Sequence, residues 1–254
     1  VRAKIRIRDA GTPFGIPEKE DLAERLDAVL DAIYAAYAKG WNEIGEAGMP
    51  EIADEAIWLG RLVVSLLPGE PEAKGMLALM LYAEARRPAR RSADGAYVPL
   101  EEQDTSLWDD SLIAHAEQLL RDANLGGPTG RYQIEAAIQS AHTARRLGGL
   151  NNWPVIVQLY DHLLVLTRSP VVVLNRAVAR AEVDGPDAAL ADLAPIADDK
   201  RMLSYQPYWA ARGHLLARAD RPTEAAEAIT VAIGLTTDEA VRTYLQSKLE
   251  ACYS

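Results

Sequence analysis

Hydrophobic residues recur every three or four positions along most of this chain, a spacing that places their side chains on one face of an α-helix. The first such segment, residues 18–39, lies between Pro17 and Gly40. Its apolar positions are Leu22, Leu26, Val29, Ile33 and Tyr37. Proline near the start and glycine just past the end are common at helix boundaries. The pattern therefore predicts an amphipathic helix over residues 18–39.

Proline marks the beginning of most later segments, because a proline in the first turn of a helix costs no internal hydrogen bond. These prolines are Pro50, Pro71, Pro154, Pro170, Pro186 and Pro222. The segment after Pro71 is apolar nearly all round, so we expect it to be the central helix of its half. Further helices are predicted over about residues 131–147, 153–167, 170–183, 186–198, 204–219, 222–235 and 237–250. The spacing of Thr236 and Glu239 predicts a capping box for the last of them.

The helical pattern breaks after Pro88. The Asp-Gly pair at residues 94–95 is a typical tight turn, and the residues after it favour extended backbone, so a short hairpin or an irregular loop is expected. Asp104 or Thr105 is expected to cap the next helix. The breaker cluster GGPTG at residues 126–130 then predicts a soft boundary between two subdomains.

The chain is therefore expected to be all-α. Alanine and leucine dominate the composition, phenylalanine occurs once, and β-branched runs are few. Residues 18–128 are predicted to form a helical subdomain with one irregular loop or short hairpin. Residues 129–254 are predicted to form an array of α-hairpins that resembles tetratricopeptide repeats. Residues 1–17 are expected to be the end of a preceding domain and its linker.

The repeat prediction depends on six residues at steps of four, three, nine, four and three. They are Trp209, Gly213, Leu216, Ala225, Ile229 and Ala232. This order matches the large and small positions of the tetratricopeptide unit, in which small residues let two antiparallel helices approach closely. Ala177, Ala189 and Leu193 repeat part of the pattern 36 residues upstream, and residues 131–167 offer a third copy. The alternative is coincidence in an alanine-rich helical protein. Arrays of this kind bind partners on a concave face.

Charge separates the first ten residues from the rest of the chain. The whole sequence has 27 Lys and Arg against 37 Asp and Glu, for a net charge of −10. Residues 1–10 hold four of those cations and one acid, so the remainder has 23 cations against 36 acids. Such a remainder is unsuited to neutralising phosphates, whereas the basic segment could face DNA or an acidic partner. Gly11 and Pro13 follow it, which predicts the last turns of a helix that begins upstream. A removed methionine and a frayed terminus are the alternative.

Catalytic and metal chemistry find little support in the sequence. Cys252 is the only cysteine, which leaves no disulfide or cysteine metal site within the chain. The histidines, His115, His142, His162 and His214, show no paired ligand spacing. No nucleophile motif is evident, and no apolar run approaches the length of a membrane span. We expect a cytoplasmic protein without a metal, cofactor or catalytic activity.

One polar stretch remains a candidate site. Arginines 86, 87, 90 and 91 precede the predicted turn, and a second polar group, which includes residues 101–104, follows it. A hairpin would bring the two groups together. The result is either a salt-bridged surface loop or a cleft whose arginines bind a carboxylate, a phosphate or a protein acid. The candidate binding residues are Arg86, Arg87, Arg90, Asp104, Trp108, Gln133 and His142.

Several long segments, taken in order, carry a resemblance to a known family. They are KIRIRDAGTPF at 4–14, PEAKGMLALMLYAEARRPAR at 71–90, DGAYVPLEEQD at 94–104, Trp108, GRYQIEAAIQSAH at 130–142, NNWPVIVQLYD at 151–161 and SPVVVLNRAVARAEVDGP at 169–186. The chain resembles the C-terminal extension, with tetratricopeptide-like repeats, of bacterial extracytoplasmic-function RNA polymerase sigma factors. The family pattern has arginine at the position of Thr105 and glutamine at the position of Glu135, so the polar site is less cationic here.

The resemblance implies a regulatory region in transcription initiation. In that family two DNA-reading domains precede this region, and residues 1–11 resemble the end of the second, a helix-turn-helix domain. The expected partners are those sigma domains or RNA polymerase, and DNA is contacted only through domains outside this sequence. The expected mechanism is protein docking that modulates sigma activity. The alternative is a helical domain that senses a small molecule and controls the sigma factor.

Overall fold

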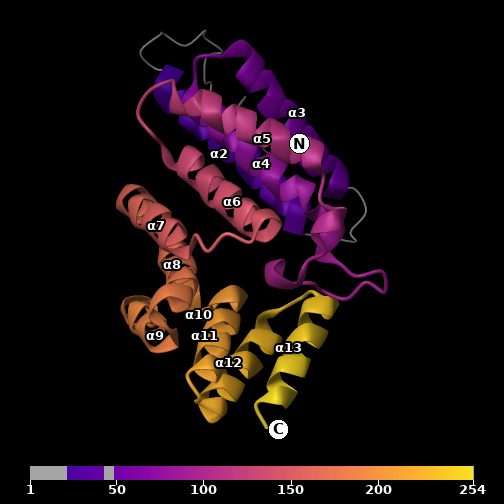
Figure 1. Cartoon of the computed structure of the whole chain (residues 1–254), viewed down its shortest axis with the longest axis vertical. Coiled ribbons are helices and arrows are strands. Elements are labelled where there is room, and N and C mark those ends of the chain that lie inside the picture. Colours follow the sequence, from indigo (N-terminus) through magenta and orange to yellow (C-terminus); the bar gives the residue numbers. More distant parts are fainter. Residues whose placement is uncertain (1–21, 43–48, 254) are drawn as a thin grey trace, which may run out of the picture. The chain divides into compact units, whose positions relative to one another are not determined.

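The structure is a computed structural model that describes residues 22–42 and 49–253. Within these ranges the chain forms twelve α-helices, α2 to α13, and a few short 3₁₀ turns (Figure 1). The described residues contain no strand, and a single isolated bridge joins Arg91 to Tyr97. The predicted all-α fold class is confirmed. The predictions for residues 1–17 lie outside the described residues.

The chain divides into two compact units, residues 1–60 and 61–254. The first unit holds α2 (Leu22–Asn42) and the beginning of α3 (Met49–Leu66). In α2 the buried side chains are Leu30, Ile33 and Tyr37, whereas Val29 is 46% exposed. The predicted stripe is therefore wrong at Val29. Leu30 takes its place because it shares a helical face with Ile33 and Tyr37 at steps of three and four.

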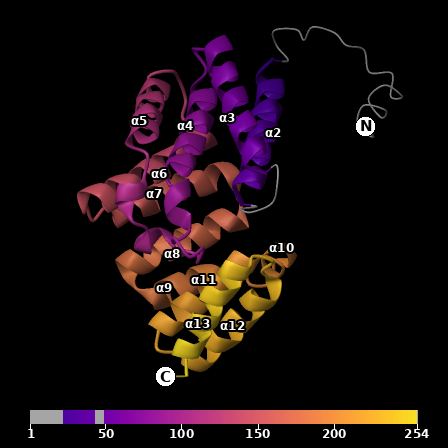
Figure 2. The same cartoon turned by 90° about the vertical axis from the view of Figure 1, so that its right-hand side faces the viewer.

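The second unit is a chain of helices, most of which are joined by short connections, whereas α4 and α5 are joined by a long one (Figures 1 and 2). Its α-helices are α4 (Pro71–Ala85), α5 (Asp110–Asn124), α6 (Arg131–Gly148), α7 (Trp153–Thr167), α8 (Pro170–Asp184), α9 (Pro186–Leu193), α10 (Lys200–Leu203), α11 (Gln206–Arg218), α12 (Pro222–Leu235) and α13 (Glu239–Ala251). Its 3₁₀ turns are η2 (Arg87–Arg90), η3 (Leu100–Glu102), η4 (Thr105–Leu107) and η5 (Ala194–Ile196). Pro71, Pro170, Pro186 and Pro222 are each the first residue of a helix, as predicted.

Helix α4 is the centre of the N-terminal part of this unit. Its residues 75–82 are all buried, and it packs against both α5 and α6. At Gly75 an added Cβ would lie only 2.7 Å from the backbone nitrogen of Gln133, so the glycine allows α4 and α6 to approach closely. The subdomain boundary predicted near residues 128–129 falls within the second unit. It lies between α5 and α6, which pack together.

One predicted helix start and one predicted capping box are wrong. The helix expected from Asp104 or Thr105 begins at residue 110, because the backbone first makes the η4 turn and Asp109 then caps α5. The carboxylate of Asp109 accepts hydrogen bonds from the backbone N–H groups of residues 111 and 112, at 2.9 and 3.0 Å. In the last helix the N-cap is Asp238, whereas Thr236 ends the preceding helix.

The six residues of the predicted repeat pack as their sizes suggest. A Cβ at Gly213 would lie 2.6 Å from Cγ1 of Ile229 and 3.3 Å from the carbonyl oxygen of Ala225, so α11 and α12 are in close contact there. Leu216, Ala225, Ile229 and Ala232 are all buried, and Trp209 packs beside them. Helices α8 and α9 form a similar pair around Ala177, Ala189 and Leu193. The assignment to the tetratricopeptide class stays a prediction.

The connection between α4 and α5 reaches the start of the last helix, α13 (Figure 1). Its predicted hairpin is a tight turn at Gly95, where φ is +87°, closed by the bridge between Arg91 and Tyr97. Arg91 forms an ion pair with Asp238, the N-cap of α13. The ring of Tyr97 lies edge-on to that of Tyr244, with centroids 5.3 Å apart. The loop is thus held against α13 by a charge pair and an aromatic contact.

Candidate functional site

Arginine and tryptophan side chains gather where the α4–α5 connection meets the second half of α6 and the beginning of α7. This arginine–tryptophan cluster consists of Arg86, Gln103, Trp108, Gln139, His142, Arg145, Arg146, Asn152 and Trp153. Glu101, on η3, contributes the acidic partner of Arg145. Two stretches that are far apart in the sequence, residues 86–108 and 139–153, therefore build the site.

The first half of the cluster forms around Arg86, which ends α4 and is 8% exposed. Its Nη2 donates a hydrogen bond of 2.7 Å to Oε1 of Gln139 on α6. Its guanidinium carbon lies 6.0 Å from the ring centroid of Trp108, within the range of a cation–π contact. Trp108 is held there because the next residue, Asp109, donates its backbone N–H to the carbonyl of Ala85 at 3.0 Å.

The second half forms around the last turn of α6. The guanidinium of Arg145 lies 4.4 Å from the ring centroid of Trp153 and pairs with the carboxylate of Glu101. Arg146 donates from Nη2 to the backbone carbonyl of Gln103 at 2.8 Å. These contacts fasten the η3 segment to the C-terminal end of α6. The positive charges of the arginines also interact favourably with the helix dipole there.

His142 lies between the two halves. Its ring meets that of Trp153 edge-on, with centroids 5.5 Å apart. Burial and, to a lesser extent, the charges of Arg145 and Arg86 lower the pKa of His142 to about 4. The imidazole is therefore neutral at pH 7, so the positive charge of the cluster resides on its arginines.

Several polar atoms of the cluster are buried but have no hydrogen-bonding partner among the described residues. They are Nε1 of Trp108, Oε1 of Gln103, Nδ1 of His142 and Oδ1 of Asn152. Trp108 and Gln103 are only 5% and 7% exposed. A buried polar atom without a partner costs about 1–3 kcal/mol, so these atoms favour a bound polar group that satisfies them.

The structure brings together three of the seven predicted site residues, Arg86, Trp108 and His142. Arg87, the first residue of the η2 turn, forms an ion pair of 2.7 Å with Glu84 in the last turn of α4. Arg90 belongs to the η2 turn, and its backbone carbonyl accepts a hydrogen bond of 3.0 Å from the backbone N–H of Val98.

Asp104 and Gln133 have local structural roles. The exposed Asp104 caps η4 by accepting the N–H of Ser106 at 2.9 Å, and its hydrogen bonds with Ser106 lower its pKa. Gln133 precedes His142 by nine residues on α6, which is about 13.5 Å along a helix. Its Nε2 donates to the carboxylate of Glu72 at 3.2 Å and to the carbonyl of Pro128 at 3.3 Å.

Sequence reasoning missed Gln139, Arg145, Arg146, Asn152 and Trp153. A signal for the first three was present, because residues 139, 142, 145 and 146 share one face of α6 at steps of three and four. Trp153 follows a glycine-containing connection, and its place beside Arg145 depends on the turn between α6 and α7.

The cluster offers a binding site of a defined chemical type. Arginine forks suit carboxylate and phosphate oxygens, and the indole rings give apolar faces for stacking. In the described part of the chain no group of three or more His, Cys, Asp or Glu side chains is placed to hold a metal ion. None of the helices described is both long and apolar enough to cross a membrane.

Comparisons with known proteins show that this chain is similar to one family over part of its length and to one relative over nearly all of it. A family of unknown function (DUF6596) matches residues 25–124. An uncharacterized protein of Rhizobium meliloti (strain 1021) is 40% identical over 251 residues, which is 98% of this chain. The chain spans 59% of the length of that relative. No solved structure matches the chain.

Proposed function

We propose that this chain is the regulatory C-terminal region of an RNA polymerase sigma factor and acts in transcription initiation by protein docking. The observation that carries the proposal is the ordered set of segments that resemble this family. Four of these segments form α4, α6, α7 and α8, and each of these helices packs against the next. The resemblance therefore falls on a connected part of the second unit.

Two further observations support a role in docking. Several large apolar side chains of the second unit lie exposed on its surface: Leu125 at 87%, Val165 at 76%, Leu150 at 57% and Val155 at 50%. Beyond residues 1–10 the chain carries 23 cations and 36 acids. An acidic surface with exposed apolar residues suits a basic, promoter-reading partner, because opposite charges steer association and apolar contacts hold it.

The length of the relative fits this arrangement. The match covers 59% of the Rhizobium meliloti protein, so in that protein the matching region is joined to a substantial further segment. We propose that the further segment holds the DNA-reading domains. The proposed role is binding rather than catalysis, in the cytoplasm, where RNA polymerase acts.

A binding measurement tests the docking step. The further segment of the relative is labelled with a fluorophore, and this chain is added while anisotropy is recorded at 50 mM and 300 mM salt. We expect saturable binding that weakens as salt rises, because charge complementarity contributes. An unrelated helical protein of the same net charge is the control. Equal binding by the control, or no binding by this chain at either salt concentration, would contradict docking.

A second candidate function is the sensing of a small anionic ligand at the arginine–tryptophan cluster. The observation that favours it is the set of buried N–H donors without partners among the described residues, above all Nε1 of Trp108 and Nε of Arg145, which can donate to an anion. A thermal-shift screen with carboxylates and inorganic phosphate is expected to raise the melting temperature, since a ligand at 100 times its Kd stabilises by about 2.7 kcal/mol. Arg145→Met should abolish the shift, whereas the exposed His115→Gln should keep it. Equal shifts in both variants would place the ligand elsewhere.

A further inference from the structure

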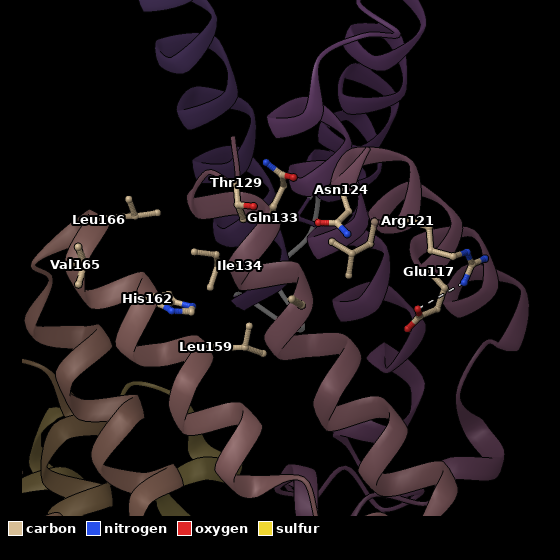
Figure 3. A pocket seen from close by; sticks show the side chains of 12 residues that line it. Glu117, Arg121, Asn124, Thr129, Gln133, Ile134, Leu159, His162, Val165 and Leu166 are labelled. Atoms are coloured by element: carbon tan, nitrogen blue, oxygen red, sulfur yellow. Dashed lines mark ion pairs between the residues drawn. The ribbon is translucent and has the colours of Figure 1, made fainter. Parts of the chain in front are cut away.

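A pocket of about 720 Å³ lies in the second unit, on the first half of α6 (Figure 3). Its wall residues come from α5, from the connection that precedes α6, from α6 itself and from α7. They are Glu117, Leu120, Arg121, Asn124, Thr129, Gln133, Ile134, Ala137, Leu159, His162, Val165 and Leu166. Pockets of about 300–1,000 Å³ are typical of small-molecule sites. The arginine–tryptophan cluster involves the other half of α6, so the two sites are distinct.

Half of the residues that line the pocket are aliphatic. Ile134 and Ala137 come from α6, and Leu159 comes from α7 on the side of the pocket opposite α5 (Figure 3). Val165 and Leu166, near the end of α7, are 76% and 52% exposed although both lie on this pocket. An apolar ligand would cover side chains that now face water, which is the main driving force for binding.

The hydrogen-bonding groups at one end of the pocket are uncharged. Figure 3 shows the side chains of Asn124, Thr129 and Gln133 gathered there. Gln133 is 3% exposed, and Glu72 and Pro128 accept from its amide nitrogen. Its carbonyl oxygen is therefore the atom oriented to accept a hydrogen bond, and the amide of Asn124 and the hydroxyl of Thr129 can donate as well as accept.

The charged residues of the pocket wall are already engaged with protein groups. Glu117 accepts hydrogen bonds from Tyr82 and from Ser140, the latter at 2.6 Å. Arg121 lies 3.9 Å from Glu117 and donates to Gln118 at 2.9 Å. This pair contributes one charge of each sign, so it favours neither an anionic nor a cationic head group.

From these observations we propose that the pocket binds an uncharged amphiphile, with an aliphatic body and an amide-type head that both donates and accepts hydrogen bonds. The aliphatic body lies along α6 and α7, and the head meets Asn124, Thr129 and Gln133. The inference does not depend on the docking proposal, because binding is measured on this chain alone.

A matched series of probes tests both parts of the ligand. N-octanoylglycinamide carries the apolar body and a neutral head, N-octanoylglycine changes only the head to a carboxylate, and N-acetylglycinamide removes the body. Ligand-observed NMR with the full 254-residue chain gives the three dissociation constants. We expect about 1 mM or tighter for the first probe, from typical ligand efficiencies. The carboxylate should bind at least about fivefold more weakly. The short probe should bind at least about tenfold more weakly, since each buried methylene contributes about fourfold.

Variants locate the binding. Ala137→Phe should fill the pocket, and Val165→Asp should place a charge on its apolar wall. Each substitution should raise the dissociation constant of N-octanoylglycinamide at least about tenfold. Val165 is exposed, so its replacement leaves the fold intact even if Ala137→Phe does not fold. The control is Leu125→Ala, an apolar residue that is 87% exposed and absent from the pocket wall, and it should bind like the parent chain.

Three results would overturn the inference. They are the absence of binding by N-octanoylglycinamide, equal or tighter binding by N-octanoylglycine, and unchanged binding in Val165→Asp. A fourth result, measured by analytical sedimentation, would also overturn it. If the parent chain associates with itself and Val165→Asp does not, the exposed apolar wall binds a second copy of the chain and not a small ligand.

Discussion

Acid should destabilise this protein through one buried histidine. His142 has an ordinary pKa of 6.5 in the unfolded chain, and burial among arginines lowers it to about 4 in the folded chain. Between these two values the unfolded chain holds a proton that the folded chain lacks. The free energy of unfolding therefore falls as the pH falls through this window.

The size of the effect follows from the two pKa values. A difference of about 2.5 units corresponds to about 3 kcal/mol of stability lost by pH 4, and about 2 kcal/mol is lost at pH 5 relative to pH 8. Other groups also titrate in this range. The substitution His142→Gln removes the imidazole and leaves them in place, so the difference between parent and variant isolates the histidine.

Urea denaturation at pH 8 and pH 5 measures this difference. The parent should lose about 2 kcal/mol more than His142→Gln between the two pH values, whereas the exposed His115→Gln should behave like the parent. NMR titration of the His142 ring should give a pKa near 4. A pKa near 6.5, or equal pH dependence in parent and His142→Gln, would show that folding does not lower the pKa of this histidine.

Three further predictions concern a helix cap, a close helix contact and an ion pair. The carboxylate of Glu72 accepts hydrogen bonds from the backbone N–H groups of residues 132 and 133, at 3.0 and 3.1 Å. Glu72→Ala should therefore lower the free energy of unfolding, measured by urea denaturation, by about 1–3 kcal/mol. A loss below about 0.5 kcal/mol would show that Glu72 does not act as a cap. Gly213→Ala should lower the free energy of unfolding by about 1–3 kcal/mol, because its Cβ meets α12. The control Gly234→Ala has open space around its Cβ and should be neutral or stabilise by up to about 1 kcal/mol. Equal effects of the two substitutions would show that α11 and α12 do not approach closely at Gly213. A double-mutant cycle of Arg91→Met and Asp238→Asn should show a coupling energy of about 0.5–1 kcal/mol, since the two side chains are 19% and 34% exposed. Zero coupling would mean that this ion pair does not hold the α4–α5 connection against α13.

Most helix positions could be predicted because this sequence marks them locally. Proline at residues 71, 170, 186 and 222 fixes the first turn of four helices, and no long-range contact is needed to recognise this. The start of α5 could not be chosen in this way. Asp104 and Asp109 are both good capping residues, and both do cap a turn; only the η4 turn between them decides that the long helix begins after the second.

The candidate site could be predicted only in part, because its geometry depends on how two helices pack. Arg86 and Trp108 were within reach of sequence reasoning, since a turn in the connection returns the chain to the end of α4. Gln139 and Arg145 join them only because α6 lies against α4, which requires the close approach at Gly75. Gln133 shares that helix but belongs to its other end, beside Glu72, because nine residues of helix separate it from His142.

We propose above that this region controls a sigma factor. The most direct test of this proposal is promoter-dependent transcription by core RNA polymerase and the segment of the Rhizobium meliloti relative that lies outside the match, with and without this chain in trans. We expect the segment to direct initiation at defined promoters, and we expect added chain to change the yield of transcript in a saturable way. A segment that directs no promoter-dependent transcription, or a yield that does not respond to the chain, would contradict it.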